Sequence, residues 1–138
     1  MFSQKYVCLF RRGHPLDGRS VSPDDFQRTE HLHLVSAGTI HGQVDELMRG
    51  ANIQRDVRLT IPHLISAGHI LRSTDLVATV TETLAASLAE PFRLAYSAIP
   101  SICPEVGIKL YWHARVHQSA LHQWLRAMVA ELFGSAAG

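Results

Sequence analysis

Hydrophobic positions along the chain follow two alternating spacings. The segments KYVCLF, HLHLVS, VRLTI and LVATV are continuously apolar or alternate every second residue, which is typical of β-strands. The segments after the last three strands place apolar residues three and four positions apart, as on one face of an α-helix. Strand and helix thus alternate three times, in units of about 25 residues, before a further strand, FRLAYSAI. This order predicts an α/β fold.

Proline and hydroxyl residues mark where the predicted helices begin and end. Ser22 and Pro23 predict the capped start of a short helix that ends near residue 30. The two later helices are predicted to open at Pro62 and after a cap at Thr81, and Pro91 is predicted to stop the second of them. Right-handed crossovers between successive strands would then cover a mostly parallel sheet with these helices.

A different pattern follows the last of these units. A proline-punctuated connector, PSICPEVG, lies near residues 99–106 and is the plausible boundary in the chain. Beyond it, IKLYW is strand-like, and a final amphipathic helix is predicted. Its apolar stripe, which requires a partner surface, consists of Leu121, Trp124, Leu125, Met128 and Leu132.

Composition limits the function classes. The chain has 138 residues, of which 46% are hydrophobic and 18% charged, and its formal net charge is +1. These values fit one globular domain, with no apolar run of the roughly 18 residues that a membrane-spanning helix needs. No overall basic field favours binding to nucleic acid. Cys8 and Cys103 lie among apolar neighbours, which predicts buried thiols in a reducing cytoplasm.

Candidate binding residues gather after the predicted strands. In open α/β sheets, ligands bind beyond the carboxyl ends of the strands, where helix N-termini attract anions. Small hydroxyl residues and glycine let a ligand approach the backbone there, and histidine can pair with an acid. The sequence therefore predicts a site for a small carboxylate or phenolic ligand. Its expected residues are Ser36, Gly38, Thr39 and His41 after one strand, Pro62, His63 and Leu64 after the next, Thr81 after the third, and Phe10 as further apolar lining.

These residues also have a structural interpretation. The hydroxyl groups of Ser36, Thr39 and Thr81 can serve only as helix caps, and His41 and His63 can be solvated or capping side chains. Their clustering at one edge of the predicted sheet is what favours ligand binding.

Catalytic and metal chemistry have little support. His113, His117 and His122 could be arranged around a metal ion, but their segment is expected to be a strand running into a turn. No Cys, Asp or Glu lies close by to complete the ligand set, and the sequence contains no GxSxG, HExxH, P-loop or GxGxxG motif. We therefore expect no enzymatic activity, no cofactor and no metal.

Several longer segments resemble a known family. RRGHPLDG, HGQVDELM, VRLTIPHLISAGHILRSTDLVATVTETLA and YWHARVHQSALHQWLR together look like the effector-binding domain of LysR-type transcription regulators. The resemblance runs from about Lys5 to Phe133 and is greatest to the branch of nodulation regulators and sensors of salicylate-like aromatics. It implies a fold like that of type 2 periplasmic binding proteins, in which two α/β subdomains hold an inducer between them.

The resemblance also implies a division of the chain. Residues 1–12 would form a hinge strand, 13–93 the second subdomain, 94–105 the return hinge and connector, and 106–138 the last strand and helix of the first, incomplete subdomain. Pro62 and His63 would lie at a helix start that faces the cleft, with the SAGTIHG loop nearby. The helix-turn-helix and the first half of the effector domain are expected to lie outside the chain.

The leading hypothesis is therefore the inducer-sensing portion of a cytoplasmic LysR-type regulator. It would bind a small aromatic or organic acid, would reach DNA only through the missing N-terminal domain, and would not associate with membranes. The alternative is a truncated regulator remnant that acts as a dimerisation or interaction module without ligand. The stripe on the last helix predicts a homodimer, including one formed by exchange of the C-terminal strand and helix.

Overall fold

The chain folds into two compact units. The computed structural model describes residues 2–35, 45–46, 48–99 and 106–134. The larger unit comprises residues 5–104, and the smaller one combines residues 1–4 with residues 105–138.

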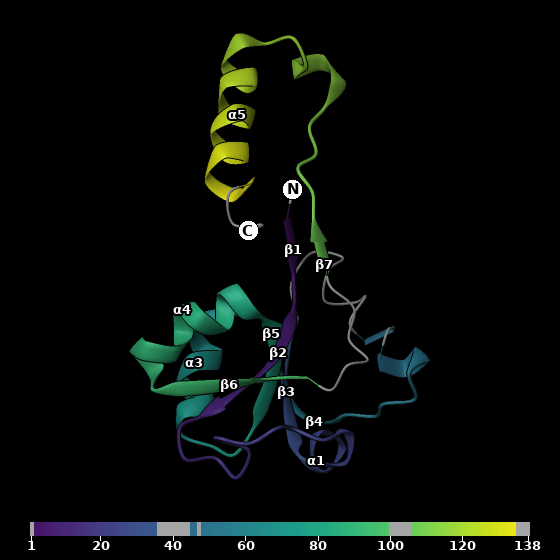
Figure 1. The fold of residues 1–138 in the computed structure, drawn as a ribbon, viewed down its shortest axis with the longest axis vertical. Helices are drawn as coiled ribbons and strands as arrows, with labels where there is room; N and C mark the ends of the chain where they lie inside the picture. Colours follow the sequence, from purple (N-terminus) through teal and green to yellow (C-terminus); the bar gives the residue numbers. More distant parts are fainter. Residues whose placement is uncertain (1, 36–44, 47, 100–105, 135–138) are drawn as a thin grey trace. The chain divides into compact units, whose positions relative to one another are not determined.

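A five-stranded sheet forms the centre of the larger unit (Figure 1). Its strands lie in the order β4-β3-β5-β2-β6. β3 pairs in parallel with both β4 and β5, whereas β2 pairs antiparallel with both β5 and β6. The strands are β2 (Tyr6–Arg11), β3 (Glu30–Leu34), β4 (Asp56–Ile61), β5 (Val77–Thr81) and β6 (Leu94–Ala98).

This arrangement confirms the predicted α/β fold and corrects the prediction of a mostly parallel sheet. The sheet is mixed, because β2 is inserted between β5 and β6 in the opposite direction. β2 precedes the three strand–helix units in the sequence, so no crossover helix dictates its direction. The local patterns that predicted the units therefore contain no information on where β2 enters.

The two faces of the sheet are covered by different segments. Two helices, α3 (Leu64–Arg72) and α4 (Glu82–Phe92), pack against one face and against each other (Figure 1). A shorter helix, α1 (Pro23–Arg28), contributes the buried Phe26 to the opposite face, where its ring meets the ring of His31 edge-on at 4.6 Å. The core between the sheet and helices α3 and α4 includes Val7, Leu9, Leu32, Leu34, Ala67, Leu71, Ala78, Val80, Ala85 and Leu88.

Helix α1 has the start that the sequence predicts. The Ser22 hydroxyl accepts a hydrogen bond from the Asp25 backbone N–H at 3.1 Å, and the Asp25 carboxylate accepts one from the Ser22 N–H at 3.2 Å. This reciprocal capping box satisfies two backbone donors that the first helical turn leaves without partners. The interactions of the Asp25 carboxylate with the side chain and backbone of Ser22, and the nearby Arg19 guanidinium, lower the pKa of Asp25.

The ends of α3 and α4 differ in detail from the predictions. Helix α3 begins at Leu64 with His63 as its N-cap, so Pro62 precedes the cap rather than opening the helix. Helix α4 begins after Thr81, as predicted, but continues through Pro91 to Phe92. A proline in the last turn removes a single helical hydrogen bond, which the helix tolerates before it ends at Arg93 in the left-handed conformation.

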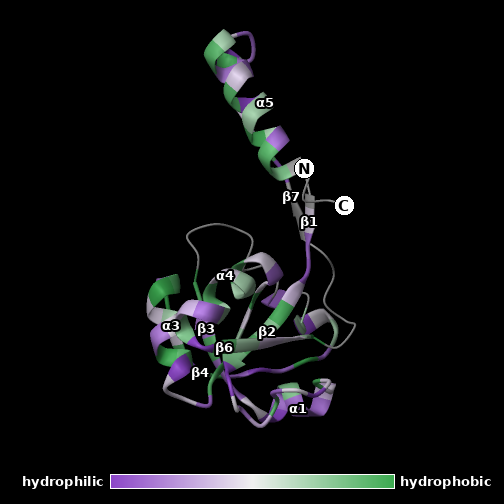
Figure 2. Cartoon of the chain, turned by 60° about the vertical axis from the view of Figure 1, so that its left-hand side comes forward, coloured by the Kyte–Doolittle hydropathy of each residue, from purple (hydrophilic) through white to green (hydrophobic). Residues whose placement is uncertain are grey.

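The smaller unit contains a two-stranded antiparallel sheet and the last helix. β1 (Phe2–Gln4) pairs with β7 (Val106–Ile108), and a 3-10 turn (Ala114–Val116) precedes α5 (Ala120–Gly134). The predicted final helix is confirmed, and apolar and polar residues alternate along it (Figure 2). The predicted strand IKLYW is corrected, because strand pairing ends where Phe2 meets Ile108. None of the described helices is both long and apolar enough to cross a lipid bilayer.

Candidate small-molecule site

The carboxyl ends of three parallel strands meet at one edge of the sheet. β4, β3 and β5 are neighbours that run in the same direction, so their last residues lie side by side. The Val35 N–H, directly after β3, donates to the carbonyl oxygen of Ile61 at the end of β4 at 2.9 Å. α3 and α4 both start from this edge, with His63 and Thr81 as their N-caps. The geometry is that of a binding edge in an open α/β sheet.

The predicted site residues are only partly brought together. Pro62 and His63 are exposed at this edge, and Leu64 and Thr81 are half-buried there. Phe10 is fully buried and lies towards the opposite end of the sheet, because its neighbour Leu9 pairs with Ala78 near the start of β5. The remaining four predicted residues, Ser36, Gly38, Thr39 and His41, lie outside the described residues.

The two helix starts at this edge differ in what already occupies them. The first backbone N–H of α4, that of Glu82, donates to the Lys5 carbonyl oxygen at 2.9 Å. Neither N-cap side chain, that of His63 nor that of Thr81, makes a capping hydrogen bond, so among the described residues the Glu82 contact is the difference between the two starts. Since the first N–H groups of a helix and its dipole favour negative charge, an acid at this edge is best placed at the start of α3, beside the His63 ring.

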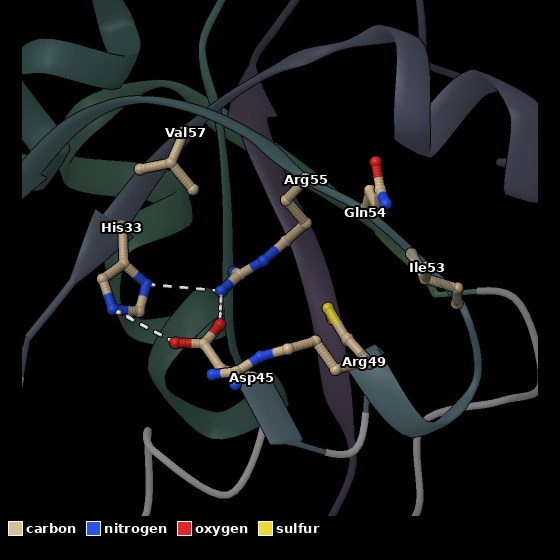
Figure 3. Close-up of a pocket in the computed structure, with 8 residues that line it drawn as sticks. His33, Asp45, Arg49, Ile53, Gln54, Arg55 and Val57 are labelled. Carbon is tan, nitrogen blue, oxygen red and sulfur yellow. Dashed lines mark hydrogen bonds and ion pairs between the residues drawn. The ribbon is translucent and has the colours of Figure 1, made fainter.

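A charged cluster that the sequence analysis did not predict lies on the sheet face opposite α3 and α4. The guanidinium of Arg55, whose side chain is only 7% exposed, forms an ion pair with Asp45. Its Nη2 atom lies 3.4 Å from His33 Nδ1, and His33 Nε2 lies 3.5 Å from Asp45 Oδ2 (Figure 3). The alternation of HLHL could have placed His33 on this face, since Leu32 and Leu34 occupy the other, but its partners come from segments that local periodicity does not connect.

The His33 ring is neutral in this cluster. Burial and the nearby Arg55 guanidinium both lower the pKa of His33 from its ordinary value of 6.5. Because Arg55 can donate only, His33 Nδ1 must accept, which leaves the ring proton on Nε2, facing the Asp45 carboxylate. The 3.5 Å contact of His33 Nε2 with Asp45 Oδ2 therefore joins a neutral ring to a carboxylate and is not an ion pair.

Two of the three histidines considered as metal ligands, His113 and His117, have structural partners. His113 Nδ1 accepts the Arg115 backbone N–H, and His117 Nδ1 accepts the Trp112 indole N–H, each at 3.1 Å. Within the part of the chain that the structure describes, no three His, Cys, Asp or Glu side chains could together hold a metal ion. Cys8 is fully buried, as predicted, and burial raises its pKa to about 12, so it is a protonated thiol at neutral pH. Its predicted counterpart Cys103 lies outside the described residues.

Comparison with known proteins gives consistent matches. The family of the LysR substrate binding domain matches residues 1–134. The transcriptional activator NagR of a Ralstonia species is 41% identical over 136 residues, which are 99% of this chain and 45% of NagR. The chain thus spans less than half the length of this curated relative.

Solved structures share the fold. A probable transcriptional regulator from Pseudomonas aeruginosa is 27% identical with a TM-score of 0.78, and the match covers 91% of this chain and 42% of that one. The effector-binding domain of QuiR, solved in complex with shikimate, has a TM-score of 0.69 at 14% identity, and the match covers 91% and 62% of the two chains.

Proposed function

Because this chain belongs to the LysR substrate-binding-domain family, we propose that it is the inducer-sensing portion of a LysR-type transcription regulator and that it binds a small organic acid, of the aromatic class, at the sheet edge beside His63. The family consists of transcription regulators and is not enzymatic. Membership confirms the resemblance inferred from the sequence.

The observation that carries this proposal is that three parallel strand ends meet at one edge of the sheet, from which α3 starts. His63 is exposed there, makes no capping bond, and stands at the positive end of a nine-residue helix. A carboxylate can therefore accept hydrogen bonds from helix N–H groups and from the imidazole, while the half-buried Leu64 offers apolar surface. The SAGTIHG segment begins two residues after the last residue of β3, so we include Ser36, Gly38, Thr39 and His41 in the proposed site.

The ligand class rests on this chemistry and on the family. QuiR, which shares the fold, holds shikimate, a small carboxylic acid. In our proposal an acid of similar size binds at this edge of the larger unit, and so shifts the equilibrium between conformations of a whole regulator. Such a regulator would work in the cytoplasm and would contact DNA through another of its parts. Phe10 would support the site only through its packing in the core.

The test is a thermal-shift and calorimetric titration with salicylate and benzoate. A ligand that binds only the native state raises the melting temperature in a concentration-dependent way. His63→Ala should weaken binding by about 1 to 3 kcal/mol, because a hydrogen bond to a charged group is lost. His63→Gln, which keeps a donor, should recover part of the affinity.

His69→Ala is the matched control, since His69 is an exposed histidine on the same helix, away from its start. The proposal fails if neither acid shifts the melting temperature at millimolar concentration, or if His63→Ala and His69→Ala bind with the affinity of the unmodified chain.

A second candidate is an interaction module that acts without ligand. It is favoured by the exposed apolar side chains of α5, of which Leu121 is 69% exposed and Trp124 is 58% exposed. Melting that depends on protein concentration, together with no response to either acid, would support this function instead.

A further inference from the structure

A cavity of about 450 Å³ lies within the larger unit, on the sheet face opposite α3 and α4. It opens between the β3–β4 pair and the helical residues 45–46 and 48–50, and His33, Asp45 and Arg55 form part of its wall (Figure 3). His63 and the start of α3 do not line it. The cavity is thus separate from the proposed inducer edge, and its volume falls within the roughly 300 to 1,000 Å³ of small-molecule sites.

The charged part of the wall carries a positive surplus. Two guanidinium groups, those of Arg49 and Arg55, and one carboxylate, that of Asp45, line the cavity, which gives the wall a formal charge of +1. The neutral His33 ring adds nothing to this sum. The guanidinium of Arg55 already contacts Asp45 and His33, so its position in the cavity wall is fixed. Arg49 is exposed, which leaves its long side chain able to turn towards a ligand at the mouth.

Apart from Gln54, the rest of the wall is apolar. Met48 and Ile53 are buried, and Val57 is 42% exposed where β4 borders the cavity. A hydrocarbon or aromatic ring placed here would contact Met48 and Ile53 and cover the exposed part of Val57, while an anionic group would reach the guanidinium of Arg49. Neither a neutral apolar ligand nor a fully polar anion such as phosphate would use both parts of the wall.

We propose that this cavity is a second binding site, which takes a small amphipathic monocarboxylate with its carboxylate on Arg49 and its apolar part against Met48, Ile53 and Val57. The Arg55–Asp45 ion pair and the His33 ring position the wall and do not themselves change partners. The site extends the proposed function, because it lets one effector domain respond to an acid at two separate places.

The experiment is a methyl and amide NMR titration of the whole chain with benzoate, with benzyl alcohol as a neutral probe of similar size. Benzoate should produce saturable shifts at Met48, Ile53 and Val57. Benzyl alcohol should bind there with an affinity lower by about tenfold or more. Arg49→Gln should lower the benzoate affinity at these signals by about tenfold or more. Arg72→Gln, which removes an exposed arginine from α3, is the matched control and should leave it unchanged.

The outcomes separate this proposal from that of the inducer edge. His63→Ala should leave the shifts at Ile53 and Val57 intact, so their presence supports the second site even if the edge binds no acid. Absence of saturable shifts at Ile53 and Val57 overturns the second site, as does an equal affinity for benzyl alcohol or an unchanged affinity in Arg49→Gln. An unchanged melting temperature of Arg49→Gln shows that the variant is folded.

Discussion

His31 is a titratable side chain held in the middle of the sheet. It is completely buried on β3, its Nε2 lies 2.7 Å from the Phe26 carbonyl oxygen, and its Nδ1 has no hydrogen-bond partner among the described residues. Burial lowers the pKa of His31 to about 4, although the Phe26 carbonyl opposes this effect. The folded protein therefore holds His31 as a neutral ring that donates to Phe26.

We predict that this residue makes the folded protein less stable as the pH is lowered. Between pH 6.5 and about 4, the unfolded chain binds a proton at His31 that the folded chain excludes, so acidification favours unfolding. Lowering the pH from 7 to 5 should cost about 1 to 2 kcal/mol through His31. His31→Gln keeps a donor for Phe26 but does not titrate, so its free energy of unfolding in urea should depend less on pH. Parallel pH profiles of the two proteins would contradict this assignment.

At the scale of the elements, α3 and α4 are packed closely at Gly68. This glycine is buried, and a Cβ atom at its position would lie 2.7 Å from the Phe92 ring. The contact explains why a residue with poor helix propensity lies inside α3: only a glycine lets the Phe92 ring approach the helix backbone.

Gly68→Ala is therefore expected to destabilise the larger unit. The overpacking should cost about 1 to 3 kcal/mol, whereas alanine should gain about 1 kcal/mol in helix propensity. The cost is the larger of the two if the Phe92 ring cannot move aside freely. Because that ring also contacts His69 at 4.9 Å, we expect a net loss of stability in thermal or urea unfolding.

Gly50→Ala serves as the control, because nothing lies within 4 Å of an added Cβ there. It should be neutral or slightly stabilising. Combining Gly68→Ala with Phe92→Leu should cost less than the sum of the two single changes, since the steric conflict is shared by the pair. Strict additivity would show that the ring and the glycine do not interact.

At the scale of the whole molecule, α5 of the smaller unit presents apolar side chains that the described residues leave exposed. Leu121, Trp124 and Leu125 of α5 are 69%, 58% and 46% exposed, and they share one stripe of the helix. Exposed apolar patches of this kind usually meet a partner. Another part of the proposed regulator and a second copy of this chain are both able to cover it.

We predict that the isolated chain self-associates through this stripe. Sedimentation velocity between about 1 and 100 µM should show a shift from monomer to dimer, because association follows mass action. Leu121→Gln combined with Leu125→Gln should weaken the dimer. Ile65→Gln, which changes an equally exposed residue of α3, should not, and a chain that stays monomeric throughout this range would exclude the homodimer.

The sequence by itself determined the features that depend on near neighbours. Hydrophobic periodicity located the strands from β2 to β6 and the helix α5, because a side chain's face follows directly from spacing along a strand or helix. The N-terminal cap of α1 was equally predictable, since Ser22 and Asp25 meet within one helical turn. The edge with Pro62, His63 and Thr81 was predictable, because parallel neighbours bring their carboxyl ends together.

The tertiary structure alone decided which distant segments meet. The insertion of β2 between β5 and β6 made the sheet mixed and carried Phe10 away from the predicted edge, because strand order depends on long-range pairing and not on local spacing. The joining of His33, Asp45 and Arg55 beside a cavity is of the same kind. Their contacts arise only when β3 and the segments that precede β4 are packed on one face, where burial selects charged partners that no pattern in the sequence connects.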